Sequence, residues 1–152
     1  MTTRTRTLAF TSTLRAPRAR VWSWLTSVEG ISREFWPILK MTTPRDVRNI
    51  QDVHPAPGAP LFRSWVLLFG VLPVDRTDLT LLRLDDGTGF VEQSPMLSMR
   101  LWRHERTLAG DRDRTTLTDR LTFEPRFAGP LVAWFIRRVF AHRHAVLRRH
   151  FG

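Results

Sequence analysis

The chain has 152 residues, of which 42% are apolar, and a formal charge of +10. This length suits one domain with one core, and the apolar content excludes general disorder. Since the sequence holds no cysteine, disulfide bonds and thiolate chemistry are excluded as well. No apolar run reaches the length of a signal peptide or of a membrane span. The sequence therefore predicts a single domain over residues 1–152 that stays in the cytoplasm.

The positive charge is concentrated at the two ends of the chain. Residues 1–28 contain five arginines and residues 125–152 contain six, with no acidic residue in either segment. Such an excess can favour nucleic acids, anionic membranes or acidic ligands. The sequence has no helix-turn-helix pattern and no basic strand interleaved with aromatics, so we expect no nucleic acid partner. Weak contact of the C-terminal segment with anionic membranes is one expectation, and an arginine-rich composition is the competing explanation.

The first third of the chain predicts a strand, two short helices and a second strand. Residues 5–15 alternate between apolar and polar side chains, which is typical of a half-buried strand. The helix that follows is expected to break at Gly30, and a second short helix is expected to end before Pro37. Residues 38–44 then predict a short strand.

The rest of the chain predicts a loop, five strands and a long helix. Residues 45–61 hold three prolines and are expected to form mainly loop. Further strands are expected at residues 62–70, 75–84, 90–96, 101–108 and 114–125. The last segment has apolar side chains at helical spacing, which are Leu131, Phe135, Ile136, Val139, Phe140, Val146 and Leu147. The fold class predicted is α+β: a curved antiparallel sheet of about seven strands wraps around a long C-terminal helix, with two short helices after the first strand.

Ionisable side chains lie in the middle of two neighbouring strands, at positions that alternation assigns to the buried face. His104 and Arg106 share one face of their strand, and on the next strand Asp119 is flanked two residues away by leucines. An unpaired carboxylate would be costly there. The sequence therefore predicts that Asp119 is ionised, buried and paired with Arg106 or His104 across the strands. Glu92, on a third strand, is a further candidate member of this polar cluster.

Several motifs resemble those of one protein superfamily. They are "FTSTLRAPRARVWSWLTSVEGI", Trp102-Arg103-His104, Leu117-Thr118-Asp119, "EPRFAGP" and "FAHRH". In these motifs the chain is similar to the START-like, or SRPBCC, superfamily, whose fold is also called helix-grip or birch-pollen-allergen-like, and to a bacterial branch of it described as ligand-binding. Relatives carry a second histidine two positions after the first, where this chain has Arg106. The resemblance implies a single START-like domain with a cavity between the curved sheet and the last helix. Members of the superfamily mostly bind hydrophobic molecules such as lipids, sterols, quinones or polyketides, and some are aromatase/cyclases or dehydratases.

The favoured hypothesis is a protein that binds a small hydrophobic or amphipathic ligand in this internal cavity. The residues expected to line it are Phe90, Glu92, Trp102, His104, Arg106, Asp119, Leu121, Phe135 and Val139. The second hypothesis is an enzyme of the polyketide cyclase or dehydratase type that uses His104 with Arg106 or Asp119. A third is an interaction protein with a closed cavity and a basic helix.

The same cluster can be explained without a ligand, as a buried charge pair that stabilises the fold. On the ligand hypothesis, Arg106 would hold a carboxylate or an enolate. The histidines near the C-terminus, His142, His144 and His150, lack the spacing of a metal site. We therefore expect neither a metal nor a cofactor.

Overall fold

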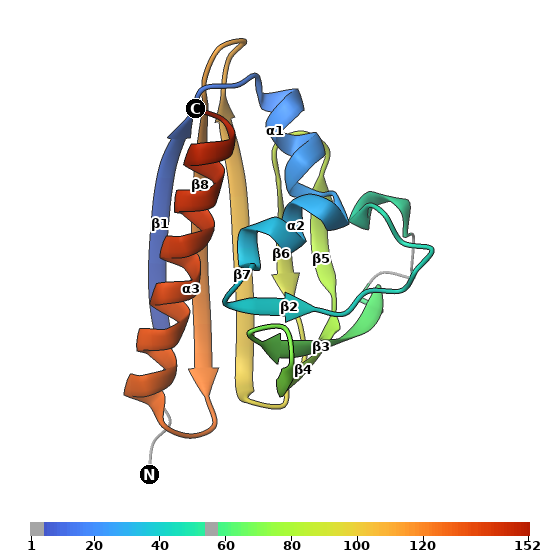
Figure 1. The fold of residues 1–152 in the computed structure, drawn as a ribbon, viewed down its shortest axis with the longest axis vertical. Helices are drawn as coiled ribbons and strands as arrows, with labels where there is room; N and C mark the ends of the chain where they lie inside the picture. Colours follow the sequence, from blue (N-terminus) through green and yellow to red (C-terminus); the bar gives the residue numbers. More distant parts are fainter. Residues whose placement is uncertain (1–4, 54–57) are drawn as a thin grey trace.

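The computed structural model describes residues 5–53 and 58–152, which contain eight strands, three helices and one 3-10 turn (Figure 1). In chain order the elements are β1 (Arg6–Leu14), α1 (Arg18–Leu25), α2 (Val28–Phe35), β2 (Leu39–Met41), the 3-10 turn η1 (Ile50–Asp52), β3 (Phe62–Leu68), β4 (Leu72–Leu79), β5 (Leu81–Asp85), β6 (Gly89–Gln93), β7 (Met99–Gly110), β8 (Thr115–Pro125) and α3 (Gly129–His150). The predicted loop at 45–61 contains η1, and its residues 54–57 lie outside the described part of the chain.

The strands form two antiparallel sheets, and the last helix packs against the larger one. One has the order β1-β8-β7-β6-β5 and the other the order β2-β3-β4. Figure 1 shows α3 running along β1 and β8, with α2 beside it, and α3 packs against all three of these elements. The predicted α+β class and helix-grip arrangement are confirmed.

The segment 75–84, which the sequence predicts as one strand, is two strands in the structure. The chain leaves the three-stranded sheet at the end of β4, and Thr80 connects it to β5 in the five-stranded sheet. The Thr80 amide donates to the Ser94 hydroxyl, and its own hydroxyl donates to the Asp78 carbonyl. These side-chain bonds satisfy Thr80 where the chain passes from one sheet to the other. The predicted strand is therefore divided into β4 and β5, and the structure has eight strands rather than about seven.

The predicted helix break at Gly30 is also wrong, because the break falls at Thr26 and Ser27 and Gly30 lies in the first turn of α2. The Ser27 hydroxyl accepts from the Gly30 amide and donates to the carbonyl of Trp24, as a helix N-cap does. A Cβ atom on Gly30 would lie 2.1 Å from that same carbonyl oxygen. The glycine is therefore needed for the close approach of the two helices, which sets the position of Glu34 one turn later.

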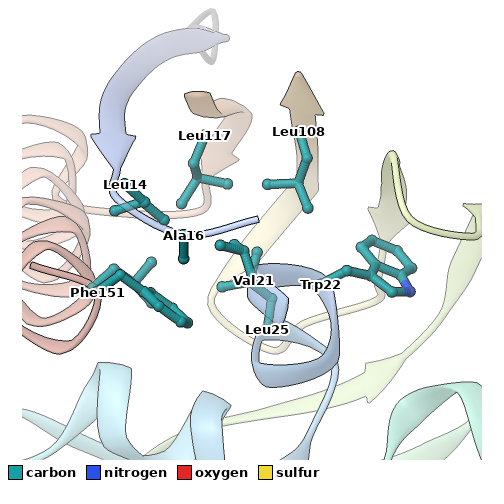
Figure 2. Close-up of a cluster of buried hydrophobic side chains, with 9 residues drawn as sticks. Leu14, Ala16, Val21, Trp22, Leu25, Leu108, Leu117 and Phe151 are labelled. Carbon is teal, nitrogen blue, oxygen red and sulfur yellow. The ribbon is translucent and has the colours of Figure 1, made fainter. Parts of the chain in front are cut away.

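Two clusters of buried apolar side chains form the core. Figure 2 shows the first, which lies where α1 meets the end of α3 and consists of Leu14, Ala16, Val21, Trp22, Leu25, Leu108, Leu117, Leu147 and Phe151. The second lies under the middle of α3 and includes Leu39, Val66, Met99, Trp102, Leu121, Phe123, Val139 and Phe140. Along β7 and β8 the segment between these clusters is occupied by His104, Arg106 and Asp119.

Candidate functional site

The pairing of β7 with β8 brings the predicted polar cluster together. Arg106 lies directly opposite Asp119, and His104 lies opposite Leu121. Both strands alternate between buried and more exposed residues along most of their length, so these side chains all point toward α3. The predicted placement of His104, Arg106 and Asp119 on one shared face is confirmed.

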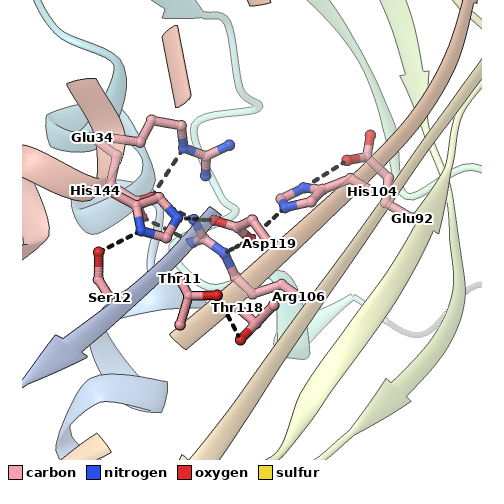
Figure 3. Close-up of polar contacts among 10 residues, drawn as sticks. Thr11, Ser12, Glu34, Glu92, His104, Arg106, Thr118, Asp119 and His144 are labelled. Carbon is pink, nitrogen blue, oxygen red and sulfur yellow. Dashed lines mark hydrogen bonds and ion pairs between the residues drawn. The ribbon is translucent and has the colours of Figure 1, made fainter. Parts of the chain in front are cut away.

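Asp119 is the centre of a buried hydrogen-bond network (Figure 3). Its Oδ1 atom accepts from Arg106 Nε and His104 Nε2, both at 2.7 Å. Its Oδ2 atom accepts from Arg106 Nη2 and His144 Nε2, both at 2.8 Å. Because an ionised carboxylate only accepts, each histidine must carry a proton on Nε2. The predicted pairing of Asp119 with Arg106 and His104 is confirmed, and His144 is an additional partner.

The Arg106 guanidinium joins two buried carboxylates. Besides its two bonds to Asp119, it donates from Nη2 to Glu34 Oε1 at 2.9 Å and from Nη1 to Glu34 Oε2 at 3.3 Å. The two residues are almost completely buried, with exposed fractions of 1% and 0%. Four of these contacts occupy most of the five donor positions of an arginine. The ligand hypothesis had assigned Arg106 to a carboxylate of the ligand. The structure instead pairs its guanidinium with Asp119 and Glu34 within the protein.

Arg143 on α3 is the second cation of the network. Its Nε atom donates to Glu34 Oε1 at 3.0 Å. Its guanidinium carbon lies 4.3 Å from the centre of the Phe35 ring and 4.8 Å from that of Phe140. Two arginines thus face the carboxylates of Glu34 and Asp119, which is the charge pairing that burial requires.

The two histidines continue the network in different directions. The Ser12 hydroxyl accepts from Arg148 Nη1 at 2.8 Å and lies 2.6 Å from His144 Nδ1. His104 extends the other way, with its Nδ1 atom 3.8 Å from Glu92 Oε1.

The charges in this network shift the pKa values of its members. Burial alone raises the pKa of Asp119, but the charges of Arg106 and His104 and their hydrogen bonds hold it well below its usual value. Burial lowers the pKa of Arg106, but Asp119 and Glu34 together raise it above its usual value. The pKa of Arg143 is lowered, because the effect of burial, reinforced by the charge of Arg106, exceeds the opposing effect of Glu34.

A pocket with a volume of about 460 Å³ lies beside the network, between α2, α3 and the two sheets. Such a volume is within the usual range for sites that bind small molecules. Its wall is mainly apolar and includes Ile31, Phe35, Met41, Val66, Leu68, Leu81, Phe90, Met96, Trp102, Phe135, Ile136 and Phe140. The network contributes polar groups to this wall from Glu92, His104, Arg106 and Arg143.

Seven of the nine residues predicted to line the cavity do line this pocket, and they are Phe90, Glu92, Trp102, His104, Arg106, Phe135 and Val139. Asp119 and Leu121 do not, which corrects the prediction for both. Asp119 is fully buried behind the side chains that bond to it. Leu121 is fully buried in the core cluster beneath α3.

The sequence reasoning missed Glu34 and Arg143, and it considered His144 only as a metal ligand. The signal for the two residues of α3 was their spacing: Arg143 and His144 each lie one turn after the buried Val139 and Phe140. Glu34 likewise lies three residues after Ile31, which lines the pocket. Charged residues on the buried stripe of a helix indicate internal partners.

Within residues 5–53 and 58–152 no group of three or more potential ligands could hold a metal ion. In the same residues no helix is long and apolar enough to cross a membrane.

Solved structures that resemble this one include an aromatase/cyclase and a START superfamily protein. The structure is similar to that of Zhui aromatase/cyclase from Streptomyces sp. R1128, with a TM-score of 0.69 and 17% identity, covering 97% of this chain and 93% of that chain. A START superfamily protein from Mycobacterium smegmatis gives a TM-score of 0.66 and 11% identity, covering 95% and 96%. Ara h 8.0201 gives a TM-score of 0.59 and 10% identity, covering 95% and 98%. These likenesses show that the fold is the START-like, or SRPBCC, fold.

A family model described as "Domain of unknown function (DUF8410)" matches residues 12–151. The chain therefore belongs to this family. A search of curated proteins found no match.

We predict that Asp119→Asn lowers the free energy of unfolding by about 3–5 kcal/mol, because it leaves buried Arg106 without one of its two counter-charges. Chemical denaturation at neutral pH measures this change. Glu105→Gln is the control, since Glu105 pairs with Arg103 on the part-exposed face of β7 and should change stability by less than about 1 kcal/mol. Equal effects of the two substitutions would contradict a structural role for the Asp119 charge.

The lowered pKa of Asp119 also predicts how stability depends on pH. Below the unfolded-state value of about 3.9 the unfolded chain binds a proton that the folded protein does not yet bind, so acid favours unfolding. The contribution of Asp119 is complete above about pH 5 and is lost as the pH falls through the folded-state pKa. Denaturation of the wild type and Asp119→Asn from pH 7 to pH 3 measures this, and the difference between them should shrink in acid. A difference that stays constant over this range would refute the prediction.

Proposed function

We propose that the protein binds a small hydrophobic or amphipathic molecule in the pocket between α2, α3 and the two sheets. The observation that carries this proposal is the pocket itself, which has a volume of about 460 Å³ and a mainly apolar wall with a few polar groups from the network. A pocket of this size and composition is typical of small-molecule sites. Lipids, polyketides and quinones are ligand classes that such a wall would suit.

The polar network supports the proposal because its two central residues are paired without a ligand. Asp119 and Arg106 have their hydrogen-bond partners inside the protein. The pocket wall therefore does not have to reorganise before a ligand enters, and a preformed site loses less free energy on binding. Similarity of fold to a START superfamily protein and to an aromatase/cyclase adds support by analogy only.

We expect that Leu81→Trp weakens the binding of the neutral fluorescent dye Nile red, because Leu81 lines the pocket and a larger side chain occupies its volume. Leu82→Trp is the matched control, since Leu82 is the next residue of β5 and is 50% exposed. Fluorescence titration should show about tenfold weaker binding for the first variant and no change for the second. Equal affinities in the two variants, with both folded, would show that the dye does not occupy this pocket.

A second candidate function is catalysis, which the geometry of His104 favours. Its Nε2 atom is held by Asp119, which fixes the ring and leaves Nδ1 on the side of Glu92 and the pocket. A histidine oriented by a buried carboxylate in this way can exchange protons with a bound molecule. Such a step would suit a polyketide cyclase or dehydratase type of reaction.

Native mass spectrometry of protein purified gently from its own host would separate binding from catalysis. A retained hydrophobic molecule whose mass stays the same on incubation indicates a binding protein. If the mass changes, the change should be lost in His104→Gln and retained in His142→Gln, because His142 lies outside the network and its Nε2 atom contacts the Trp36 carbonyl. Equal turnover by the two variants would refute a catalytic role for His104.

The predicted contact with anionic membranes also belongs to this proposal. Three residues near the start of α3 that line the pocket are well exposed, namely Phe127 (66%), Leu131 (64%) and Trp134 (55%). Arg137 and Arg138 follow them on the same helix. Exposed aromatic and basic side chains together suit the surface of an anionic membrane.

A further inference from the structure

Arg143 has hydrogen-bond donors that the protein does not use. Among the described residues, the bond from its Nε atom to Glu34 is the only hydrogen bond that its side chain makes. The side chain is nevertheless buried, with an exposed fraction of 5%, and it forms part of the pocket wall. Its two Nη groups have no protein acceptor among the described residues and remain accessible, so an acceptor on a molecule in the pocket can reach them.

The nearby negative charge does not fully compensate Arg143. Glu34 bonds to Arg143 through one oxygen, whereas it bonds to Arg106 through both. The rings of Phe35 and Phe140 lie against the guanidinium and keep its faces from water. The lowered pKa of Arg143 has the same origin, since burial and the neighbouring Arg106 oppose its charge more than Glu34 supports it.

The other charged groups of the pocket wall already have partners. Arg106 makes four hydrogen bonds to Asp119 and Glu34. Asp75 accepts from the amide and the hydroxyl of Ser98, and Glu92 accepts from the Ser94 hydroxyl at 2.6 Å. A hydrogen bond from an Nη group of Arg143 is consequently the contact in the pocket wall that would most favour an anionic oxygen of a ligand.

We infer that Arg143 recognises an acidic group and that the pocket takes a hydrophobic carboxylic acid. A carboxylate has two oxygens in the spacing that the planar fork of a guanidinium matches, and the hydrocarbon part would occupy the apolar body of the pocket. This inference rests on the proposed ligand-binding function and narrows it to one class of ligand. It also moves the expected recognition of a carboxylate from Arg106 to Arg143.

The test compares decanoate with decan-1-ol, which share a chain and differ in the head group. Each is titrated as a competitor of bound Nile red at pH 8, where the acid is ionised. The wild type should bind decanoate about tenfold more tightly than decan-1-ol, which corresponds to about 1.4 kcal/mol. Arg143→Met should remove this preference, so that the two compounds bind with about equal affinity. Arg137→Met, which removes an exposed arginine from the same helix, should keep the preference.

Each result decides the inference. Equal affinity of the wild type for acid and alcohol overturns it and leaves the proposed hydrophobic pocket intact. A preference for the acid that survives in Arg143→Met overturns it too. If neither compound displaces the dye, the inference fails, whereas the proposed function is tested separately by the Leu81→Trp titration. Should Arg143→Met not fold, as circular dichroism would show, Arg143→Lys takes its place: it keeps the charge but lacks the planar fork, so it should weaken the preference for the acid, and an undiminished preference overturns the inference.

Discussion

The buried carboxylate of Asp119 is the constraint on which the arrangement of this molecule depends. A carboxylate without partners is not tolerated in a core, and Asp119 obtains its partners from elements far apart in the sequence. Arg106 comes from the adjacent strand β7 and His144 from α3. Through Arg106 the network reaches Glu34 on α2, and through His144 it reaches Ser12 on β1. The final helix can therefore dock on the sheet in only one position without leaving a charge unpaired.

This docking also determines the shape of the pocket. Glu34 on α2 bonds to Arg106 on the sheet and to Arg143 on α3. These bonds fix α2, α3 and the sheet relative to one another at the polar end of the pocket. The close approach of α1 and α2 at Gly30, where a Cβ atom would meet the Trp24 carbonyl, places Glu34 correctly for both bonds. A buried network of this kind contributes more to a unique arrangement than to net stability, since well-packed apolar groups could be equally stabilising.

The sequence was sufficient to predict the parts of the site that follow strand periodicity. Asp119 alternates along its strand with two buried leucines, so it was expected on the buried face. The same alternation along the neighbouring strand placed His104 and Arg106 on that face as well. It was not sufficient for Glu34, Arg143 and His144, because a charged residue on a helix is normally placed in solvent by its polarity alone. These residues are buried only because their partners on the sheet are present, which is a tertiary effect. The change of sheet at Thr80 is also a tertiary effect. The Thr80 amide donates to the Ser94 hydroxyl instead of to a carbonyl of a neighbouring strand, and the sequence of the segment does not show this.

The network divides its members into those that stabilise the fold and those that face the pocket. Asp119 and Arg106 accept or donate almost all the bonds they can make within the protein, so a ligand has little to add to them. His104 and Arg143 each use one nitrogen for the network, and both line the pocket. Nδ1 of His104 and the two Nη groups of Arg143 make no hydrogen bond within the network. A group that is anchored on one side and incompletely bonded on the other is rigid and still able to bind. The same buried charges that fix α3 on the sheet therefore orient the polar end of the pocket.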